Sequence, residues 1–308
     1  MPKPTMLRLQ EHAAVIVTFH PDIVTITRQV SLLDDLAHVI FVDNGSGQEA
    51  LKALRGLAAG NDHVEVLELG GNEGLAAALN AGIECAAARG ARSVLLLDQD
   101  SLFEPSAPTR LLDGLNRVQQ DTGRLCCAGP VLLDPETGMN HGFHYVANGW
   151  RWARAFPPSS AAPIAVANLN GSGTTMPIDL FRVLGPLDAS LFIDHVDTDW
   201  SFRVLHGGFG LFGLPSVAFD HRMGERGRRI WLLGWRVWPE RSPLRHYFLF
   251  RNTVRLLGRQ HVPSVWKVWA VGKMAVSVVV VGLTDARRGS QLGMMWKGIR
   301  EAVQERRA

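Results

Sequence analysis

Two clusters of carboxylates in this chain could do chemistry, and the first is Asp98 and Asp100 in the segment LLLDQDS. They follow an apolar run at residues 94–97, which predicts a buried strand that ends at the two acids. Residues i and i+2 of an extended segment point to the same side, so both carboxylates can face one ligand. A hard cation such as Mg²⁺ or Mn²⁺ takes few carboxylates and completes its coordination with water and phosphate oxygens. The pair therefore predicts a metal and hydroxyl site, although helix caps and solvated turns use the same spacing.

The second cluster is Asp194, Asp197 and Asp199 in the segment LFIDHVDTDWSFR. The neighbouring Phe192 and Trp200 predict a partly buried setting, in which the pKa of at least one carboxyl group should be raised. Perturbed carboxylates of this kind mark candidate functional sites. The alternative is a helix N-terminus whose acids interact favourably with the helix dipole.

The elements that must position these acids are best defined in the first 130 residues, where short β-rich runs alternate with Ala- and Leu-rich segments. Residue type and length predict strands at 13–19, 38–44, 63–69 and 93–99, and helices near 23–33, 48–58 and 73–88. This alternation predicts an α/β fold with a parallel sheet covered on both faces. Such sheets bind ligands at the carboxyl ends of their strands, where Thr18, Asp43, Asn72 and Asp98 all fall.

After Pro135 the alternation stops. Residues 138–163 are rich in Gly, Pro and Trp and predict a loop or hairpin insertion. Residues 171–176 predict a flexible turn, residues 197–208 a helix that ends at its glycines, and residues 211–221 a strand that ends at His221.

The charge is divided unevenly along the 308 residues. Residues 1–221 hold 14 Lys and Arg against 24 Asp and Glu, a net charge of −10, whereas residues 222–308 hold 18 against 5, a net charge of +13. The basic part contains Trp266, Trp269 and a Val-rich run, with Lys267 and Lys273 between them. About ten apolar residues are uninterrupted, too few for a span of roughly 20. A helix in the membrane interface, or one packed on the domain or a partner, is therefore expected.

Other sequence features exclude some classes of protein. The three cysteines form no metal-ligand spacing and the first residues lack an apolar signal segment, which predicts a reduced cytosolic chain. The segment GSGQEA at residues 45–50 has the letters of a dinucleotide-binding fingerprint, but it follows the second predicted strand rather than the first. The basic part has no recognised nucleic-acid-binding motif, and its cations lie beside Trp and Val runs that suit lipid better.

Seven segments taken together resemble those of a known family in order and spacing: VIVTFHP, FVDNGS, GNEGLAAALNAGIECA, LLLDQDS, NGSGTTM, LFIDHVDTDWSFR and FDHRMGE. They resemble inverting family 2 glycosyltransferases with the GT-A fold, over about residues 13–252. The segments LDQDS and FIDHVDTDW are most similar to those of bacterial rhamnosyltransferases, and RHYFLFRN at 245–252 resembles that group's C-terminal segment. The resemblance implies a GT-A catalytic domain at 1–221, with a nucleotide-sugar half at 1–130 and an acceptor half at 131–221. A basic, Trp-bearing helical extension would follow at 222–308.

The resemblance also assigns donor-binding roles by position. Asp43 matches the acid that hydrogen-bonds the nucleobase or nucleoside, and Thr18 lies in the loop of the same pocket. Asp98 matches the acid near the ribose hydroxyls, and Asp100 matches a ligand of Mg²⁺ or Mn²⁺ bridging to the diphosphate. Asn72 either contacts the nucleotide or caps a helix.

The remaining roles concern the metal and the proton. His221 matches a histidine that can complete the metal shell, although a lone histidine can equally be structural. Asp197 matches the catalytic carboxylate when the segment is aligned on Arg203, and Asp199 is the runner-up. Val196 departs from the pattern, because many relatives have Glu at that position.

The function implied is transfer of L-rhamnose from dTDP-rhamnose to a hydroxyl of a glycan or lipid-linked saccharide in cell-envelope polysaccharide synthesis. A UDP-sugar donor and a catalytically inactive GT-A binding module are the alternatives. The extension is expected to hold a cytoplasmic enzyme peripherally at the anionic inner face of the cell membrane.

Overall fold

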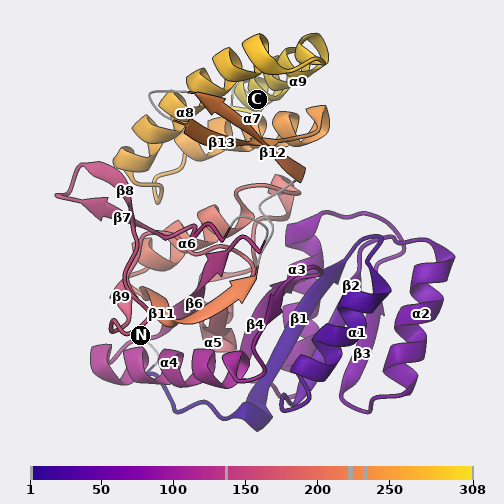
Figure 1. The fold of residues 1–308 in the computed structure, drawn as a ribbon. Helices are drawn as coiled ribbons and strands as arrows, with labels where there is room; N and C mark the ends of the chain where they lie inside the picture. Colours follow the sequence, from indigo (N-terminus) through magenta and orange to yellow (C-terminus); the bar gives the residue numbers. More distant parts are fainter. Residues whose placement is uncertain (1–2, 136–137, 221–224, 232–234, 307–308) are drawn as a thin grey trace.

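The computed structural model describes residues 3–135, 138–220, 225–231 and 235–306 (Figure 1). Its N-terminal half alternates strands and helices in the predicted order. These elements are β1 (His12–Thr18), α1 (Ile23–Leu32), β2 (His38–Asp43), α2 (Gln48–Ala59), β3 (Val64–Glu68), α3 (Leu75–Ala88) and β4 (Ser93–Asp98). The strands lie side by side in the order β3, β2, β1, β4, and all their pairings are parallel. The predicted parallel α/β arrangement is thus confirmed for this half.

Successive residues of these strands pack on opposite faces of the sheet, as the two-residue period of a strand requires. In β1, Ala13 and Val15 belong to the buried cluster that includes α3. Ala14 and Ile16 belong to the cluster that includes α1 and α4 (Ala107–Thr122). Helices therefore cover both faces, and the polar groups that follow the strands are left at their carboxyl ends.

The second half continues the sheet with mixed strand directions. Four strands extend it beyond β4: β10 (Thr175–Pro177), β6 (Cys126–Leu133), β11 (Gly210–Asp220) and β5 (Leu102–Phe103), while β9 (Ile164–Ala165) pairs with β11. β10 runs antiparallel between β4 and β6, whereas β6 and β11 are parallel. The segment 171–176 therefore ends in a short central strand rather than being a turn throughout, because Thr174 and Thr175 pair with the backbone of β4.

Other segments of this half match the predicted insertion and helix. Residues 138–163 contain the hairpin β7 (Phe143–Ala147) and β8 (Arg151–Ala155). The remaining helical elements are η1 (Leu9–Glu11), α5 (Ile178–Leu184), η2 (Ala189–Leu191) and α6 (Val196–His206).

The C-terminal part forms a layer that lies beyond the sheet (Figure 1). It consists of the antiparallel pair β12 (Glu225–Trp231) and β13 (Trp235–Glu240), followed by α7 (Pro243–Leu257), α8 (Ser264–Thr284) and α9 (Arg288–Glu305). Leu256, Trp266 and Ala270 share a buried cluster with Trp200 and Phe202 of α6. These residues join the layer to the main hydrophobic core, whereas Phe250, Val281 and Met295 form a separate buried cluster within the layer.

The helix α8 is longer than the apolar run in the sequence indicates. It has 21 residues, because Lys267 and Lys273 are accommodated within it. By length and composition alone it could cross a membrane, yet residues such as Trp266 and Val281 are buried against the rest of the chain.

Candidate active site

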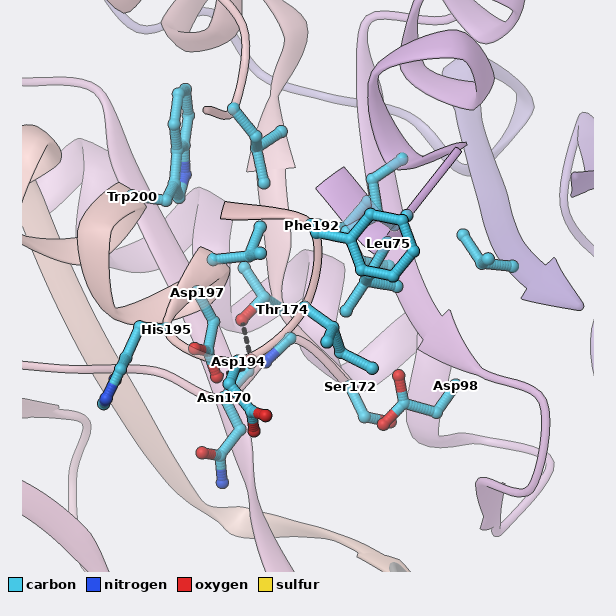
Figure 2. Close-up of a pocket in the computed structure, with 18 of the residues that line it drawn as sticks. Leu75, Asp98, Asn170, Ser172, Thr174, Phe192, Asp194, His195, Asp197 and Trp200 are labelled. Atoms are coloured by element: carbon cyan, nitrogen blue, oxygen red, sulfur yellow. Dashed lines mark hydrogen bonds between the residues drawn. The ribbon is translucent and has the colours of Figure 1, made fainter. Parts of the chain in front are cut away.

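A cavity of about 560 Å³ lies at the carboxyl ends of the parallel strands. The polar residues that line it form four groups: Asn44, Asn72, Asp98, Gln99 and Asp100 at the ends of β2, β3 and β4; Asn170, Ser172 and Thr174 before β10; Asp194, His195, Asp197 and Ser201 before and in α6; and Arg241 and Arg245 before and in α7. Figure 2 shows Asp98 on one side of this cavity and Asp194 and Asp197 on the other, with Ser172 between them. The fold thus brings Asp98 and Asp100 to the same cavity as Asp194 and Asp197 of the second acidic cluster.

The end of β4 is held firmly where Asp98 and Asp100 enter the cavity. The buried Gln29 donates to the backbone carbonyls of Asp98 at 2.9 Å and Ser101 at 2.7 Å. The side chain of Gln99 accepts from the backbone N–H of Phe19 at 2.8 Å and donates to the Phe19 carbonyl at 3.2 Å. These bonds tie the loop after β1 to the loop after β4, so the Asp98 and Asp100 side chains project from a fixed backbone.

The chemistry of this pair suits a hard divalent cation. Asp98 is half-buried and Asp100 is exposed, and both line the cavity. Within the residues that the structure describes, no three His, Cys, Asp or Glu side chains gather as a ready-made metal site. Two carboxylates fit Mg²⁺ or Mn²⁺ nonetheless, because such ions draw most of their ligands from water and substrate phosphates. His221, the second predicted ligand, lies outside the described residues.

Thr18 and Asp43 are buried and are not among the residues that line the cavity. The Asp43 carboxylate accepts from the Thr18 hydroxyl at 3.1 Å and from the backbone N–H groups of Gly45 at 3.2 Å and Ser46 at 2.9 Å. Gly45 has φ +92°, and a Cβ there would come within 2.8 Å of the Gly71 backbone. Through these hydrogen bonds Asp43 holds the loop after β2 in its conformation. The residue type alone does not indicate this structural role.

Asn44, which the sequence analysis did not single out, reaches the cavity from that loop. Its side-chain amide donates to Asn72 at 3.1 Å, and its carbonyl oxygen accepts from the backbone N–H of Glu73 at 2.8 Å. Asn72 also lines the cavity, and its side chain accepts from the backbone N–H of Gly74 at 3.1 Å. Asn72 therefore organises the start of α3 and also faces the cavity, while its contact with a nucleotide stays a prediction.

Asp197 lies in the first turn of α6 and lines the cavity. Its carboxylate accepts from the backbone N–H of Thr198 at 2.7 Å and from that of Gly171 at 3.3 Å. Burial raises the pKa of Asp197, while these hydrogen bonds oppose the rise. A carboxylate with a raised pKa is a stronger proton acceptor than an ordinary Asp, as a general base requires.

Asp199 faces away from the cavity. Only 1% of its side chain is exposed, and it accepts from Arg259 at 2.6 Å and His261 at 2.7 Å. Both partners follow α7, so Asp199 anchors the C-terminal layer to α6. Its carboxylate is therefore already hydrogen-bonded to Arg259 and His261.

The segment before α6 is strained, and α7 supports it. Phe192, Asp194 and His195 all have positive φ values between 62° and 64°, which cost about 1–3 kcal/mol each in non-glycine residues. The amide of Asn252 donates to the carbonyls of Leu191 at 2.7 Å, Ile193 at 2.8 Å and Asp194 at 3.0 Å. Asn252 therefore stabilises the backbone that carries the acids into the cavity.

Two arginines of the basic part enter the same cavity. Asp194 accepts from Arg245 at 2.8 and 2.9 Å and lies 3.5 Å from a guanidinium nitrogen of Arg241. Sequence reasoning missed both arginines as site residues. The segment RHYFLFRN held the signal, because it contains Arg245 and Asn252 on one helix.

Known protein sequences resemble this chain over part or nearly all of its length. Residues 15–122 match the family described as Glycosyl transferase family 2. The chain is 27% identical over 287 residues to dTDP-rhamnosyl transferase RfbF of Shigella flexneri, covering 93% of this chain and 92% of that protein.

Solved structures show the same fold at low identity. GalNAc-T7 with UDP, GalNAc and Mn²⁺ has a TM-score of 0.60 at 17% identity over 96% of this chain, which spans 56% of that chain. The mannosyltransferase PcManGT from Pyrobaculum calidifontis, in complex with GDP-Man and Mn²⁺, has a TM-score of 0.53 at 15% identity over 96% of this chain and 85% of its own. The chain therefore carries a glycosyltransferase family 2 domain at residues 15–122, has the GT-A fold and is a glycosyltransferase.

Proposed function

We propose that the enzyme transfers L-rhamnose from dTDP-rhamnose to a hydroxyl of a glycan or lipid-linked saccharide in cell-envelope polysaccharide synthesis. The observation that carries this proposal is one cavity lined by Asp98, Asp100 and Asp197, in which Figure 2 shows Asp98 across from Asp197. The donor is inferred from the relative named dTDP-rhamnosyl transferase, which is similar over nearly the whole chain.

The strand-end side of the cavity is proposed to bind the donor nucleotide. Asp98 would accept hydrogen bonds from the ribose hydroxyls, and Asp100 would hold Mg²⁺ or Mn²⁺ near the diphosphate, with His221 as a further ligand. Thr18 and Asp43 would shape the nucleoside end through the loop that they hold, and Asn44 and Asn72 would contact the nucleotide from that loop. The bound cation would offset the negative charge that develops on the departing diphosphate. The two solved relatives that contain Mn²⁺ support this choice of metal.

The opposite side of the cavity is proposed to activate the acceptor. The acceptor hydroxyl oxygen attacks the anomeric carbon, its proton passes to the Asp197 carboxylate, and the bond from that carbon to the diphosphate oxygen breaks. This single displacement inverts the anomeric configuration and needs no protein nucleophile. Asp197 is preferred to Asp199 because it lines the cavity, whereas the Asp199 carboxylate is engaged by Arg259 and His261.

A UDP-sugar donor is the second candidate, and the solved structure of GalNAc-T7 with UDP favours it. A thermal-shift comparison of dTDP-rhamnose with UDP-sugars, each with Mn²⁺, separates the two. Stabilisation by dTDP-rhamnose and not by UDP-sugars is expected. Stabilisation by a UDP-sugar alone would replace the proposed donor.

The outward face of α8 is proposed to contact an anionic membrane from the cytoplasmic side. Its exposed apolar side chains are Val268, Val271, Val276, Val278, Val279 and Leu283. Exposed apolar surface of this extent marks an interaction site. Basic residues flank it, since Lys273 lies within the helix and Arg287 and Arg288 follow its end, and each cation near anionic lipid contributes about 1 kcal/mol.

A further inference from the structure

We propose that the side-chain amide of Asn170 binds hydroxyl groups of the sugar that the enzyme transfers, and that Asn170 is therefore a specificity-determining residue of the donor site. The inference rests on the proposed function, because it assigns one part of the donor, the sugar ring, to a residue of the same cavity. It concerns the sugar rather than the nucleotide and the metal, for which other residues of the cavity are proposed.

Asn170 differs from the other amide side chains that line the cavity, because the protein itself does not use it. Asn44 and Asn72 are hydrogen-bonded to each other at 3.1 Å, and Gln99 is hydrogen-bonded to the Phe19 backbone through both its oxygen and its nitrogen. In the described part of the chain the Asn170 side chain has no hydrogen-bond partner, although it is half-buried and lines the cavity. This amide is therefore available to a ligand.

The backbone that carries Asn170 is held on both sides. The Thr174 hydroxyl donates to the Asn170 carbonyl at 2.5 Å, and the backbone N–H of Leu169 donates to the Ser201 hydroxyl of α6 at 3.1 Å. A side chain on a fixed backbone loses little conformational freedom when it binds a ligand, which favours binding. The free amide is thus preorganised rather than part of a loose loop.

The loop that carries this side chain connects the two sides of the cavity. The backbone N–H of Gly171 donates to the Asp197 carboxylate at 3.3 Å. The Ser172 hydroxyl shares a hydrogen bond of 2.5 Å with the buried hydroxyl of Ser101, the residue that follows Asp100. The loop therefore runs from the proposed base to the proposed metal ligand.

The transferred sugar must lie along this loop. In a single displacement the anomeric carbon stands between the departing diphosphate oxygen and the attacking hydroxyl, and the reacting atoms are about 3–3.5 Å apart. The diphosphate is proposed to bind near Asp100, and the attacking hydroxyl near Asp197. Figure 2 shows Ser172 between Asp98 and Asp197, with Asn170 on the same side as Asp197. A sugar ring that spans these two sides is within reach of the Asn170 amide.

An amide is well suited to sugar hydroxyls, because its NH₂ group donates and its oxygen accepts. Neighbouring hydroxyls of a pyranose ring can use both functions at once. An ionised carboxylate only accepts, and that of Asp194, nearby in the cavity, is already paired with Arg245. A site that hydrogen-bonds a hydroxyl discriminates against sugars that lack it, since the polar group of the protein is then left unpaired. The chemical class inferred is a sugar with adjacent free ring hydroxyls, as L-rhamnose has.

Calorimetric titration of dTDP-rhamnose and of dTDP into the full chain with Mg²⁺ tests this assignment. Asn170→Ala should weaken the binding of dTDP-rhamnose at least about fivefold, the scale of one or two neutral hydrogen bonds. Its affinity for dTDP, which lacks the sugar, should stay unchanged and thereby show that the donor site is folded. The matched control is Asn61→Ala, which removes an amide that donates to the Leu57 carbonyl at 2.8 Å at the end of α2. This variant should bind both ligands like the wild type.

Equal losses of dTDP and dTDP-rhamnose affinity in Asn170→Ala would assign the amide to the nucleotide and overturn the proposal. Unchanged affinity for both ligands would overturn it as well, because the amide would then contact no part of the donor. A wild type that binds UDP and UDP-glucose in place of the two dTDP compounds would contradict the proposed donor instead. The same pair of titrations with UDP and UDP-glucose would then decide the function of Asn170 independently.

Discussion

Asp197 and Asp199 are two positions apart in α6, yet the helix sends them to opposite sides. Each residue turns an α-helix by about 100°, so side chains at i and i+2 point about 200° apart. Asp197 consequently faces the cavity, and Asp199 faces Arg259 and His261. The sequence could show both acids but could not separate their functions, because the partners of Asp199 lie about 60 residues away.

Substitution of Asp197 by Asn should therefore lower turnover, whereas substitution of Asp199 by Asn should lower the free energy of unfolding. Asp197→Asn should lower donor turnover by at least about a hundredfold, the usual scale for a general base, without lowering the thermal midpoint. Asp199→Asn should lower the free energy of unfolding by about 3 kcal/mol, because the buried ion pair with Arg259 is broken. Release of dTDP from dTDP-rhamnose measures the turnover, and urea unfolding measures the free energy of unfolding. Normal turnover by Asp197→Asn would refute the assignment of the base.

The same residue sets the expected pH dependence. Because burial raises the pKa of Asp197, the carboxylate is protonated and inactive at a higher pH than an ordinary Asp. Turnover should fall as the pH drops through this raised pKa. The sign for stability is opposite to that of a salt-bridged acid: the contribution of Asp197 decreases as the pH rises from the unfolded pKa through the folded pKa. Asp197→Asn should remove this decrease from the pH profile of the unfolding free energy.

Among the elements, α7 supports the segment that leads into the proposed base, Asp197. Asn252 accepts from Arg251 at 3.1 Å and donates to three carbonyls at residues 191–194. Arg251 itself donates to the Ser190 carbonyl at 2.9 Å. The hydrogen bonds from α7 thus offset the conformational strain of residues 192–195, so the basic part of the chain stabilises one wall of the cavity.

Asn252→Ala should accordingly damage both stability and activity. Loss of its hydrogen bonds leaves buried carbonyls without a donor, which costs about 1–3 kcal/mol in urea unfolding. Donor turnover should also fall at least about tenfold, because the backbone that precedes Asp197 is released. The matched control is Asn116→Ala, which removes two hydrogen bonds of 2.9 Å to the Leu7 backbone far from the cavity. It should lose similar stability but keep its turnover, and equal turnover in both variants would contradict the supporting function of α7.

The N-terminal elements could be predicted from sequence to within a few residues, because apolar runs and helical segments of ordinary length define them locally. The strand β10 was predicted as a turn, since its pairing with β4 connects residues about 80 positions apart. The same limit applies to the site. Asp98 and Asp197 could be selected by type and resemblance, whereas Asn44, Arg241 and Arg245 become site residues only through the folded arrangement.

At the scale of the whole molecule, the acidic part of the chain and the basic layer meet at the cavity, and the outward face of α8 is the surface that we propose contacts a membrane. Val279→Asp places a charge on that face, where 58% of the Val279 side chain is exposed. Flotation with vesicles that contain phosphatidylglycerol should show lost binding by this variant. Val24→Asp, at a position 78% exposed on α1, is the matched control and should bind like the wild type. Equal flotation of the wild type and Val279→Asp would contradict membrane contact through α8.

The central claim is that one cavity binds dTDP-rhamnose with a divalent cation held by Asp100. Calorimetric titration of dTDP-rhamnose and of a UDP-sugar into wild type and Asp100→Ala, each with and without Mn²⁺, tests it most directly. The wild type should bind dTDP-rhamnose more tightly with Mn²⁺ than without it and more tightly than the UDP-sugar, and Asp100→Ala should lose the effect of Mn²⁺. Equal dTDP-rhamnose affinity in the wild type and Asp100→Ala, with Mn²⁺ present, would contradict the account.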